Sequence, residues 1–255
     1  MTTGTPFTPL VKVEGGAGGP GRMQVTVDED GVPFWQGGDL DPRWFAVSSV
    51  GSFSGNVSSM RTYDDVHGWA YVTGARVLVV ASDFAKGSRY RAVGVPSLSN
   101  LTYMAVANRA SKSRARKAAA GQFLAGQVRL PWVGHVVWAP PSMPRRLRGQ
   151  IRVIGTHRTV FGDQESVGLC FRLADPGEVV PLVTLLVERV QADRMEHEQT
   201  SADHRSELAA IRPPVSVNTT SPDTLASLKL PGNWVVTAGS AFLGSVSAAS
   251  ADVMA

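Results

Sequence analysis

Short apolar segments separated by turn residues are the feature that most limits how this chain can fold. The clearest example is residues 71–90, YVTGARVLVVASDFAKGSRY, where Gly74 and Ala75 separate Tyr71 and Val72 from an apolar run at 77–80. Turn residues between short apolar runs are typical of antiparallel strands joined by tight turns. A further strand is predicted over 88–93, so this stretch predicts consecutive strands of one sheet.

The same pattern recurs on both sides of this stretch. Residues 22–38 alternate as far as Val27, turn at Asp30 and Gly31 and resume at Val32, which predicts a hairpin. Prolines and glycines separate four more strand-like segments, at 126–130, 133–139, 150–155 and 166–173. We therefore expect an α+β protein that is mainly β.

A closing helix is predicted over 175–198. Asp175, Pro176 and Glu178 stand at the N-cap, first and third positions of that helix, where such residues satisfy the free backbone amides. Pro181 indicates that the regular helix begins near Val180, because proline donates no hydrogen bond. One apolar stripe follows at helical spacing: Val179, Leu182, Val183, Leu186, Val187 and Val190.

Composition divides the chain into three parts. Residues 1–21 are rich in Gly, Pro and Thr and predict a flexible lead-in, residues 22–199 one domain, and residues 200–255 a tail of low charge rich in Ser, Thr and Ala. The tail is expected to be partly disordered alone, and it could act as an assembly arm or add a strand either to the domain or to a partner. The N-terminus lacks the pattern of a signal peptide, and no run reaches the roughly 18 apolar residues of a membrane span. These observations predict a cytoplasmic protein, in which Cys170 is a buried thiol of a strand.

The stretch Thr73, Gly74, Ala75, Arg76, Val77 resembles the opening of the second strand of bacterial pleckstrin-homology-like and GRAM-like domains, where Thr, two turn residues and Arg commonly precede an apolar run. Its continuation SDFAKGSRY, a basic Ala-rich helix and AGQVRLPWVGHVV are similar to actinobacterial members of that group. The resemblance covers roughly residues 65–195, and Ala75 departs from it, because the family often has a basic residue there. It implies a small barrel or curved antiparallel sheet capped by the helix at 176–198. Lipid-binding, peptide-binding and scaffold roles all occur on this fold.

Two basic clusters are candidates for binding anions. Residues 97–121 predict a helix that begins near Ser99 and ends at Gly121. This helix carries the first cluster, Arg109, Lys112, Arg114, Arg116 and Lys117, and a predicted loop carries the second, Arg145, Arg146 and Arg148. Either cluster fits phosphates or anionic headgroups, or a plainly solvated surface. No aromatic residue lies between the charges, which disfavours stacking of single-stranded bases.

Sequence patterns of enzymes are not met. GGAGGPGR lacks the Gly-Lys-Ser/Thr ending of a phosphate-binding loop, and HEQTS at 197–201 lacks the second histidine of a zinc protease. No Gly-x-Ser-x-Gly elbow joins a strand to a helix. We therefore expect no catalytic residue, no cofactor and no metal ligand.

A non-enzymatic binding or scaffold protein is the function that these features favour. Its partner would be another protein or a second copy, with Trp234, Phe242 and Leu243 of the tail as candidate contacts. The other tryptophans are expected to be packing residues. Two alternatives stay open: binding of nucleic acid or phospholipid through residues 109–117, and a structural subunit whose tail becomes ordered on assembly.

Overall fold

The fold was analysed in a computed structural model of the chain. It describes residues 7–14, 25–54, 59–84, 88–92, 122–140, 143–144, 147–158, 164–196, 200–212 and 225–237. The predicted helix at 97–121 lies outside the described residues. In the described part, neither α-helix combines the length and the apolar composition that crossing a membrane requires.

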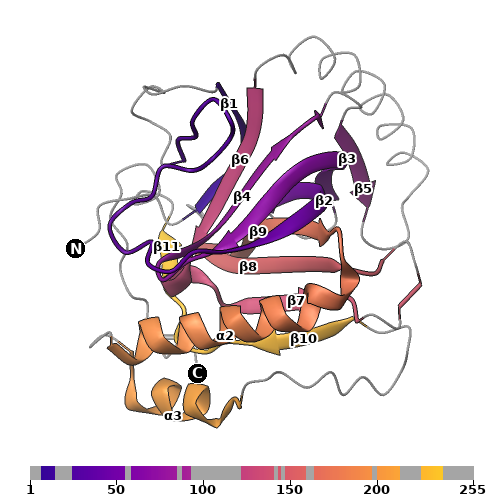
Figure 1. Cartoon of the computed structure of the whole chain (residues 1–255). Coiled ribbons are helices and arrows are strands. Elements are labelled where there is room, and N and C mark those ends of the chain that lie inside the picture. The colour runs from indigo at the N-terminus through magenta and orange to yellow at the C-terminus, as the bar shows by residue number, and fades with distance from the viewer. Residues whose placement is uncertain are drawn as a thin grey trace.

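The described residues build one sheet of eleven strands, in which every pairing but one is antiparallel (Figure 1). Its first six strands are β1 (Phe7–Glu14), β2 (Arg43–Ser54), β3 (Ser59–Val72), β4 (Arg76–Ser82), β5 (Ser88–Ala92) and β6 (Gln122–Arg129). The others are β7 (His135–Trp138), β8 (Gln150–Arg158), β9 (Gln164–Leu173), β10 (Ala226–Lys229) and β11 (Val235–Thr237). All the predicted strands from 71 to 173 are thus confirmed.

Strand order and curvature set the shape of the sheet. Its order is β1-β6-β4-β3-β2-β9-β8-β7-β10, with β5 beside the first half of β3 and β11 parallel to β8. The register of β2 shifts against both of its neighbours between Val47 and Ser49, and such bulges bend a sheet. A Cβ added to Gly126 of β6 would lie 3.0 Å from Leu169 Cδ2 of β9, so these two strands face each other across the core. In the described residues the end strands β1 and β10 do not pair, so the sheet is curved but not closed into a barrel.

A closing helix, α2 (Val179–Glu196), packs on the concave side of the sheet (Figure 1). A short 3₁₀ turn, η3 (Pro176–Glu178), precedes it, and the Asp175 side chain accepts a hydrogen bond from Gly177 N at 2.8 Å. The predicted helix and the capping role of Asp175 are therefore confirmed, with the regular helix beginning at Val179. The predicted apolar stripe is buried in full: Val179, Leu182, Val183, Leu186, Val187 and Val190.

Two regions outside the predicted domain supply strands to its sheet. Residues 7–14, in the predicted flexible lead-in, pair with β6 as β1, because their apolar residues cover part of that strand. In the predicted tail, β10 and β11 add strands to the domain, which is one of the two alternatives left open above. With α3 (Ala202–Ala210) they lie on the main domain, since Leu208, Ala226 and Leu230 are buried in its core. The predicted hairpin reduces to a turn at 28–31 and one bridge between Val27 and Pro33.

A second, smaller core lies on the opposite face of the sheet from α2. Segment 25–36 crosses β6, β4 and β3 there and buries Val25 and Val27 against Tyr71 and Leu78. Gly31, with φ of +81°, lets this segment approach the Phe123 ring, because an added Cβ would lie 2.4 Å from that ring. The segment covers only part of the face, and the uncovered part forms the candidate site.

Candidate functional site

The turn between β3 and β4 contains the Thr-Gly-Ala-Arg motif of the family resemblance. Thr73 Oγ1 accepts hydrogen bonds from the backbone amides of Ala75 and Arg76 at 3.1 and 3.0 Å. The same hydroxyl donates to Asp39 Oδ1 at 2.8 Å. A threonine suits this position because its hydroxyl satisfies turn amides while reaching a carboxylate.

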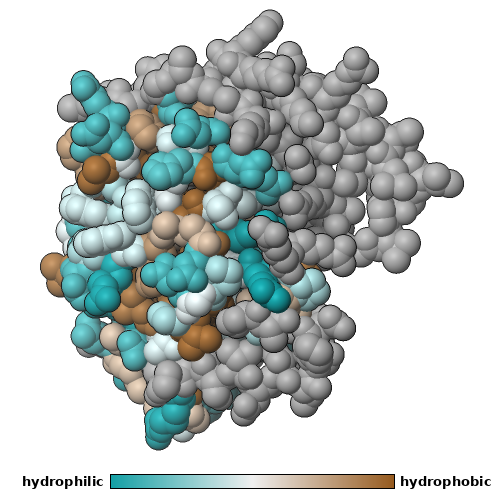
Figure 2. All heavy atoms as spheres, turned by 45° about the vertical axis from the view of Figure 1, so that its right-hand side comes forward, coloured by the Kyte–Doolittle hydropathy of each residue, from teal (hydrophilic) through white to brown (hydrophobic). Residues whose placement is uncertain are grey.

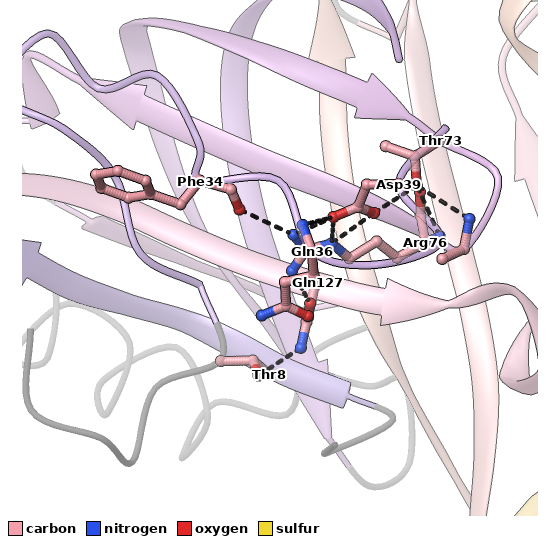
Figure 3. Close-up of polar contacts among 8 residues, drawn as sticks. Thr8, Phe34, Gln36, Asp39, Thr73, Arg76 and Gln127 are labelled. Atoms are coloured by element: carbon pink, nitrogen blue, oxygen red, sulfur yellow. Dashed lines mark hydrogen bonds and ion pairs between the residues drawn. The ribbon is translucent and has the colours of Figure 1, made fainter. Parts of the chain in front are cut away.

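Arg76 and Asp39 form a buried ion pair at the centre of the motif (Figure 3). Arg76 Nη2 lies 2.6 Å from Asp39 Oδ2, and Arg76 Nε donates to both carboxylate oxygens at 3.0 and 3.1 Å. The two side chains are only 2% and 1% exposed. Arg76 Nη1 also donates to Gln127 Oε1 of β6 at 2.7 Å, and Gln127 donates on to Thr8 of β1. The motif therefore joins β1, β4 and β6 to the loop that carries Asp39.

Asp39 closes the loop at 34–41 onto the sheet. Its Oδ2 accepts from Gln36 N at 2.8 Å, and its own amide donates to Gln36 O at 2.9 Å, which forms a tight turn around Gly37 and Gly38. Gly38 has φ of +94°, a conformation that favours glycine. On the other side of the turn, Gly74 N donates to Leu40 O at 3.1 Å. The loop is thus fixed at both ends of its turn.

Three exposed tryptophans surround Tyr71 beside this loop. Trp44 of β2 is the direct cross-strand neighbour of Tyr71, and Trp69 stands two residues before Tyr71 on β3, so the three share one face. Trp35 of the fixed loop contacts the Tyr71 ring edge-to-face with centroids 5.4 Å apart. Trp35, Trp44 and Trp69 are 42%, 62% and 37% exposed. We call Trp35, Trp44, Trp69 and Tyr71 the tryptophan surface.

The expectation that the tryptophans are packing residues is therefore wrong for three of them. Trp132 and Trp138 are buried in the core, as expected, but Trp35, Trp44 and Trp69 are not. The sequence does contain a signal for the exposed position of Trp44. Apolar residues occupy consecutive positions at 44–47, so they fall on both faces of one strand. Phe45 and Val47 fill the main core, which leaves Trp44 on the other face.

Apolar and acidic residues adjoin the tryptophan surface. Phe34 and Leu40 are exposed on the fixed loop, and the Phe34 ring points away from the buried ion pair (Figure 3). Burial, and secondly the nearby Asp28 carboxylate, raise the pKa of Tyr71, so its hydroxyl stays protonated at neutral pH. On the face seen in Figure 2, apolar residues of the described part lie in small groups among polar ones.

A second buried cation holds the C-terminal strands in place. Arg194 of α2 is 1% exposed and donates to the carbonyl oxygens of Leu230 at 2.7 Å, Pro231 at 2.6 Å and Val133. Burial lowers the pKa of Arg194 to about 10, so the group remains charged at neutral pH. Because its partners are backbone carbonyls of two segments, its role is to fix the loop between β10 and β11 against the core.

An open pocket of about 500 Å³ lies where β7, β8 and β10 meet α3. Its lining mixes apolar Ile154, Ile211 and Leu228 with His135, Lys229 and Glu207. Burial, and secondly Lys229, lower the pKa of His135. One cation and one carboxylate on an open wall select no particular charge of ligand. The pocket therefore gives a weaker indication of function than the tryptophan surface does.

Of the residues proposed from sequence, the structure describes two. Arg148 is exposed, and its side chain donates to Met143 O. Trp234 is half-buried against the main core, and its amide donates to Pro131 O at 2.8 Å. The remaining candidates lie outside the described residues: Arg109, Lys112, Arg114, Arg116, Lys117, Arg145, Arg146, Phe242 and Leu243.

Among the described residues, no group of three or more His, Cys, Asp or Glu side chains is arranged to hold a metal ion. Comparison of the chain with protein-family models, with curated proteins and with solved structures gives no match in any of the three. The functional argument therefore depends on the geometry of the chain itself.

Proposed function

We propose that this chain is a non-enzymatic binding module that contacts another protein through the tryptophan surface. The observation that carries the proposal is the set of three exposed indole rings around Tyr71 on one sheet face. Tryptophan is enriched among the residues that dominate binding energy at protein interfaces. Exposed aromatic residues grouped on one face typically mark such an interface.

The rigidity of the surface supports the same function. Two of the three tryptophans stand on neighbouring strands, and the third is on a loop fixed by the Arg76–Asp39 ion pair. A surface that is ordered before binding loses less conformational entropy when the partner arrives. Such a surface binds more tightly than a mobile loop of equal composition.

A pleckstrin-like or GRAM-like scaffold is part of the proposal. Seven strands of the sheet lie side by side in the order β6-β4-β3-β2-β9-β8-β7. In the chain these seven follow one another from β2 to β9, with only β5 inserted among them. The last of these strands in the chain, β9, leads through the turn η3 into α2, which packs on the concave side. A curved antiparallel sheet followed by a capping helix is what the sequence resemblance implied, and this agreement supports the assignment. The tryptophan surface stands on the outer face of that sheet, away from α2.

The test is a selection of displayed peptides on immobilised full-length protein, followed by calorimetry of the selected peptides. We expect the Trp44→Ala, Trp69→Ala double variant to weaken binding by about 30-fold or more, the loss for roughly 2 kcal/mol at an interface hot spot. The matched control is Met195→Ala, which removes an exposed apolar side chain from α2 instead. Equal binding by the wild type and the double variant would show that partners attach elsewhere.

A further inference from the structure

We infer that the tryptophan surface binds a proline-rich segment in the polyproline II conformation. The inference rests on the proposed function and names the chemistry of the partner. It starts from four neighbouring positions on the outer face of β2 and β3. Trp44 lies directly opposite Tyr71 on this face. Ala46, the next outward residue of β2, lies opposite Trp69 and stays partly exposed. Three large rings therefore surround one methyl group, which leaves space for a ring of the partner.

The spacing of these positions is close to the repeat of polyproline II. Diagonal positions on neighbouring strands are about 7–8 Å apart, which is the distance from Ala46 to Tyr71. Polyproline II has three residues per turn, so every third side chain projects on the same side at intervals of about 9 Å. When one proline ring lies over Ala46, the proline one turn later therefore lies beside Tyr71 and Trp35, whose ring centroids are 5.4 Å apart.

The hydrogen-bonding capacity of the surface matches the same partner. An indole N–H donates and cannot accept, and in the part of the chain that the structure describes the indoles of Trp35, Trp44 and Trp69 donate to no protein atom. Tyr71, the one ring with an oxygen, is only 8% exposed. An ordinary extended peptide would bring N–H groups to this face, where burial without an acceptor costs free energy. Proline has a carbonyl acceptor and no N–H, so it supplies what the indoles need and leaves no donor unpaired.

Charge gives no competing preference. Farther along β2, Ser49 pairs with Asp64 on one side and with Arg172 on the other, and both charged residues already interact within the protein. The acidic turn at 28–31 lies over β6, two strands from β3. Asp83 is exposed one residue past the end of β4. The charges nearest the rings are thus of both signs and already have partners, which favours a neutral segment.

The exposed area suits a short segment better than a second copy of the chain. Trp35, Trp44 and Trp69 are 42%, 62% and 37% exposed. At roughly 250 Å² for a whole tryptophan, they offer about 350 Å² together. A standard interface buries about 800 Å² on each partner, which is more than these rings expose even with Phe34 and Leu40 beside them. A polyproline II segment is already extended, so it also loses little conformational entropy on binding.

The experiment uses four fluorescein-labelled peptides, each of five repeats of Ser-Pro-Pro, Ser-Ala-Ala, Ser-Leu-Leu or Ser-Lys-Lys. Fluorescence anisotropy measures their binding to the full-length protein at low and high salt. We expect the proline peptide to bind at least tenfold more tightly than each of the others. Its affinity should be equal at both salt concentrations, because its binding forms no pair of exposed charges.

Variants of the protein assign this binding to the surface. Trp44→Ala with Trp69→Ala should weaken the proline peptide at least tenfold, while Met195→Ala should leave it unchanged. Ala46→Leu fills the space between the rings and should weaken the proline peptide at least fivefold, although it adds apolar surface. Both chain neighbours of Ala46 are in the main core, so its own side chain lies on the outer face and the core is unchanged. Circular dichroism of each variant checks the fold.

Four results would overturn the inference. Proline-peptide binding that is unchanged in the tryptophan double variant would place the segment elsewhere. Unchanged binding by Ala46→Leu would show that no ring enters the space above Ala46. The third result is no binding of the proline peptide at submillimolar protein. The fourth is a leucine or lysine peptide that binds as tightly as the proline peptide and depends on Trp44 and Trp69. That fourth result would leave the proposed binding function standing and remove only its proline-rich partner.

Discussion

Removal of the Asp39 carboxylate is the sharpest test of how the site is held. The change Asp39→Leu leaves the Arg76 guanidinium buried without its counter-ion, because that group is only 2% exposed. It removes three hydrogen bonds from Arg76 and one each from Thr73 and Gln36. We expect a large loss of folding free energy.

The magnitude follows from the burial of the pair. Breaking a buried ion pair by removing one partner typically costs about 3–5 kcal/mol, since the remaining charge stays desolvated. Replacing both partners by apolar residues of similar size is often neutral. Asp39→Leu alone and Arg76→Met alone should therefore each cost about 3 kcal/mol or more, and the double variant clearly less than the sum. For a chain of this size the single changes should lower Tm by about 10 °C.

The assay is urea unfolding of the wild type, the two single variants and the double variant, followed by far-UV circular dichroism. Tryptophan fluorescence of the folded single variants gives a second readout, since Trp35 stands on the loop that Asp39 fixes. Additive costs in the double variant would refute the reasoning, because they would show that Asp39 and Arg76 do not stabilise each other. A cost below about 1 kcal/mol for Asp39→Leu would refute it as well, since that is the range of exposed pairs.

Two further predictions concern the C-terminal strands and pH. Arg194→Ala removes the donor from buried carbonyls of residues 133, 230 and 231, and should cost about 3 kcal/mol or more. It should also open residues 225–237 to limited proteolysis; equal cleavage of wild type and variant would contradict this role. Because the pKa of His135 is lowered in the fold, the unfolded chain binds the proton more readily, so stability should fall as pH drops below about 6.5. His135→Gln should reduce that slope, by at most about 1.4 kcal/mol per pH unit in urea titrations, and an unchanged slope would assign it to other groups.

Local chemistry explains the elements that could be predicted from sequence. The turn at Gly74 and Ala75 and the cap at Asp175 depend on residues only a few positions apart, so the sequence displays the whole pattern. The apolar stripe of α2 is likewise visible at helical spacing. Each of these features appears in the structure close to its predicted position.

Pairing between distant segments explains what could not be predicted. Arg76 was singled out as part of a motif, but its counter-ion Asp39 stands 37 positions earlier, and no local pattern joins them. The strand at 7–14 could not be predicted for the same reason, because its pairing partner β6 lies more than 100 residues later in the chain. The exposure of Trp44 depends on how much of the outer face segment 25–36 covers, which is a property of the packed sheet.

The buried ion pair holds one of the exposed tryptophans in position. A loop with adjacent glycines at 37 and 38 has a large conformational entropy, and ordering it costs free energy at each residue. The network around Asp39 supplies that ordering during folding, so Trp35 is already beside Tyr71 when a partner arrives. Under the proposed function, a partner would then have only its own chain to order on binding. In that proposal the Thr-Gly-Ala-Arg motif would act on binding through the loop that it fixes, because Arg76 itself is buried.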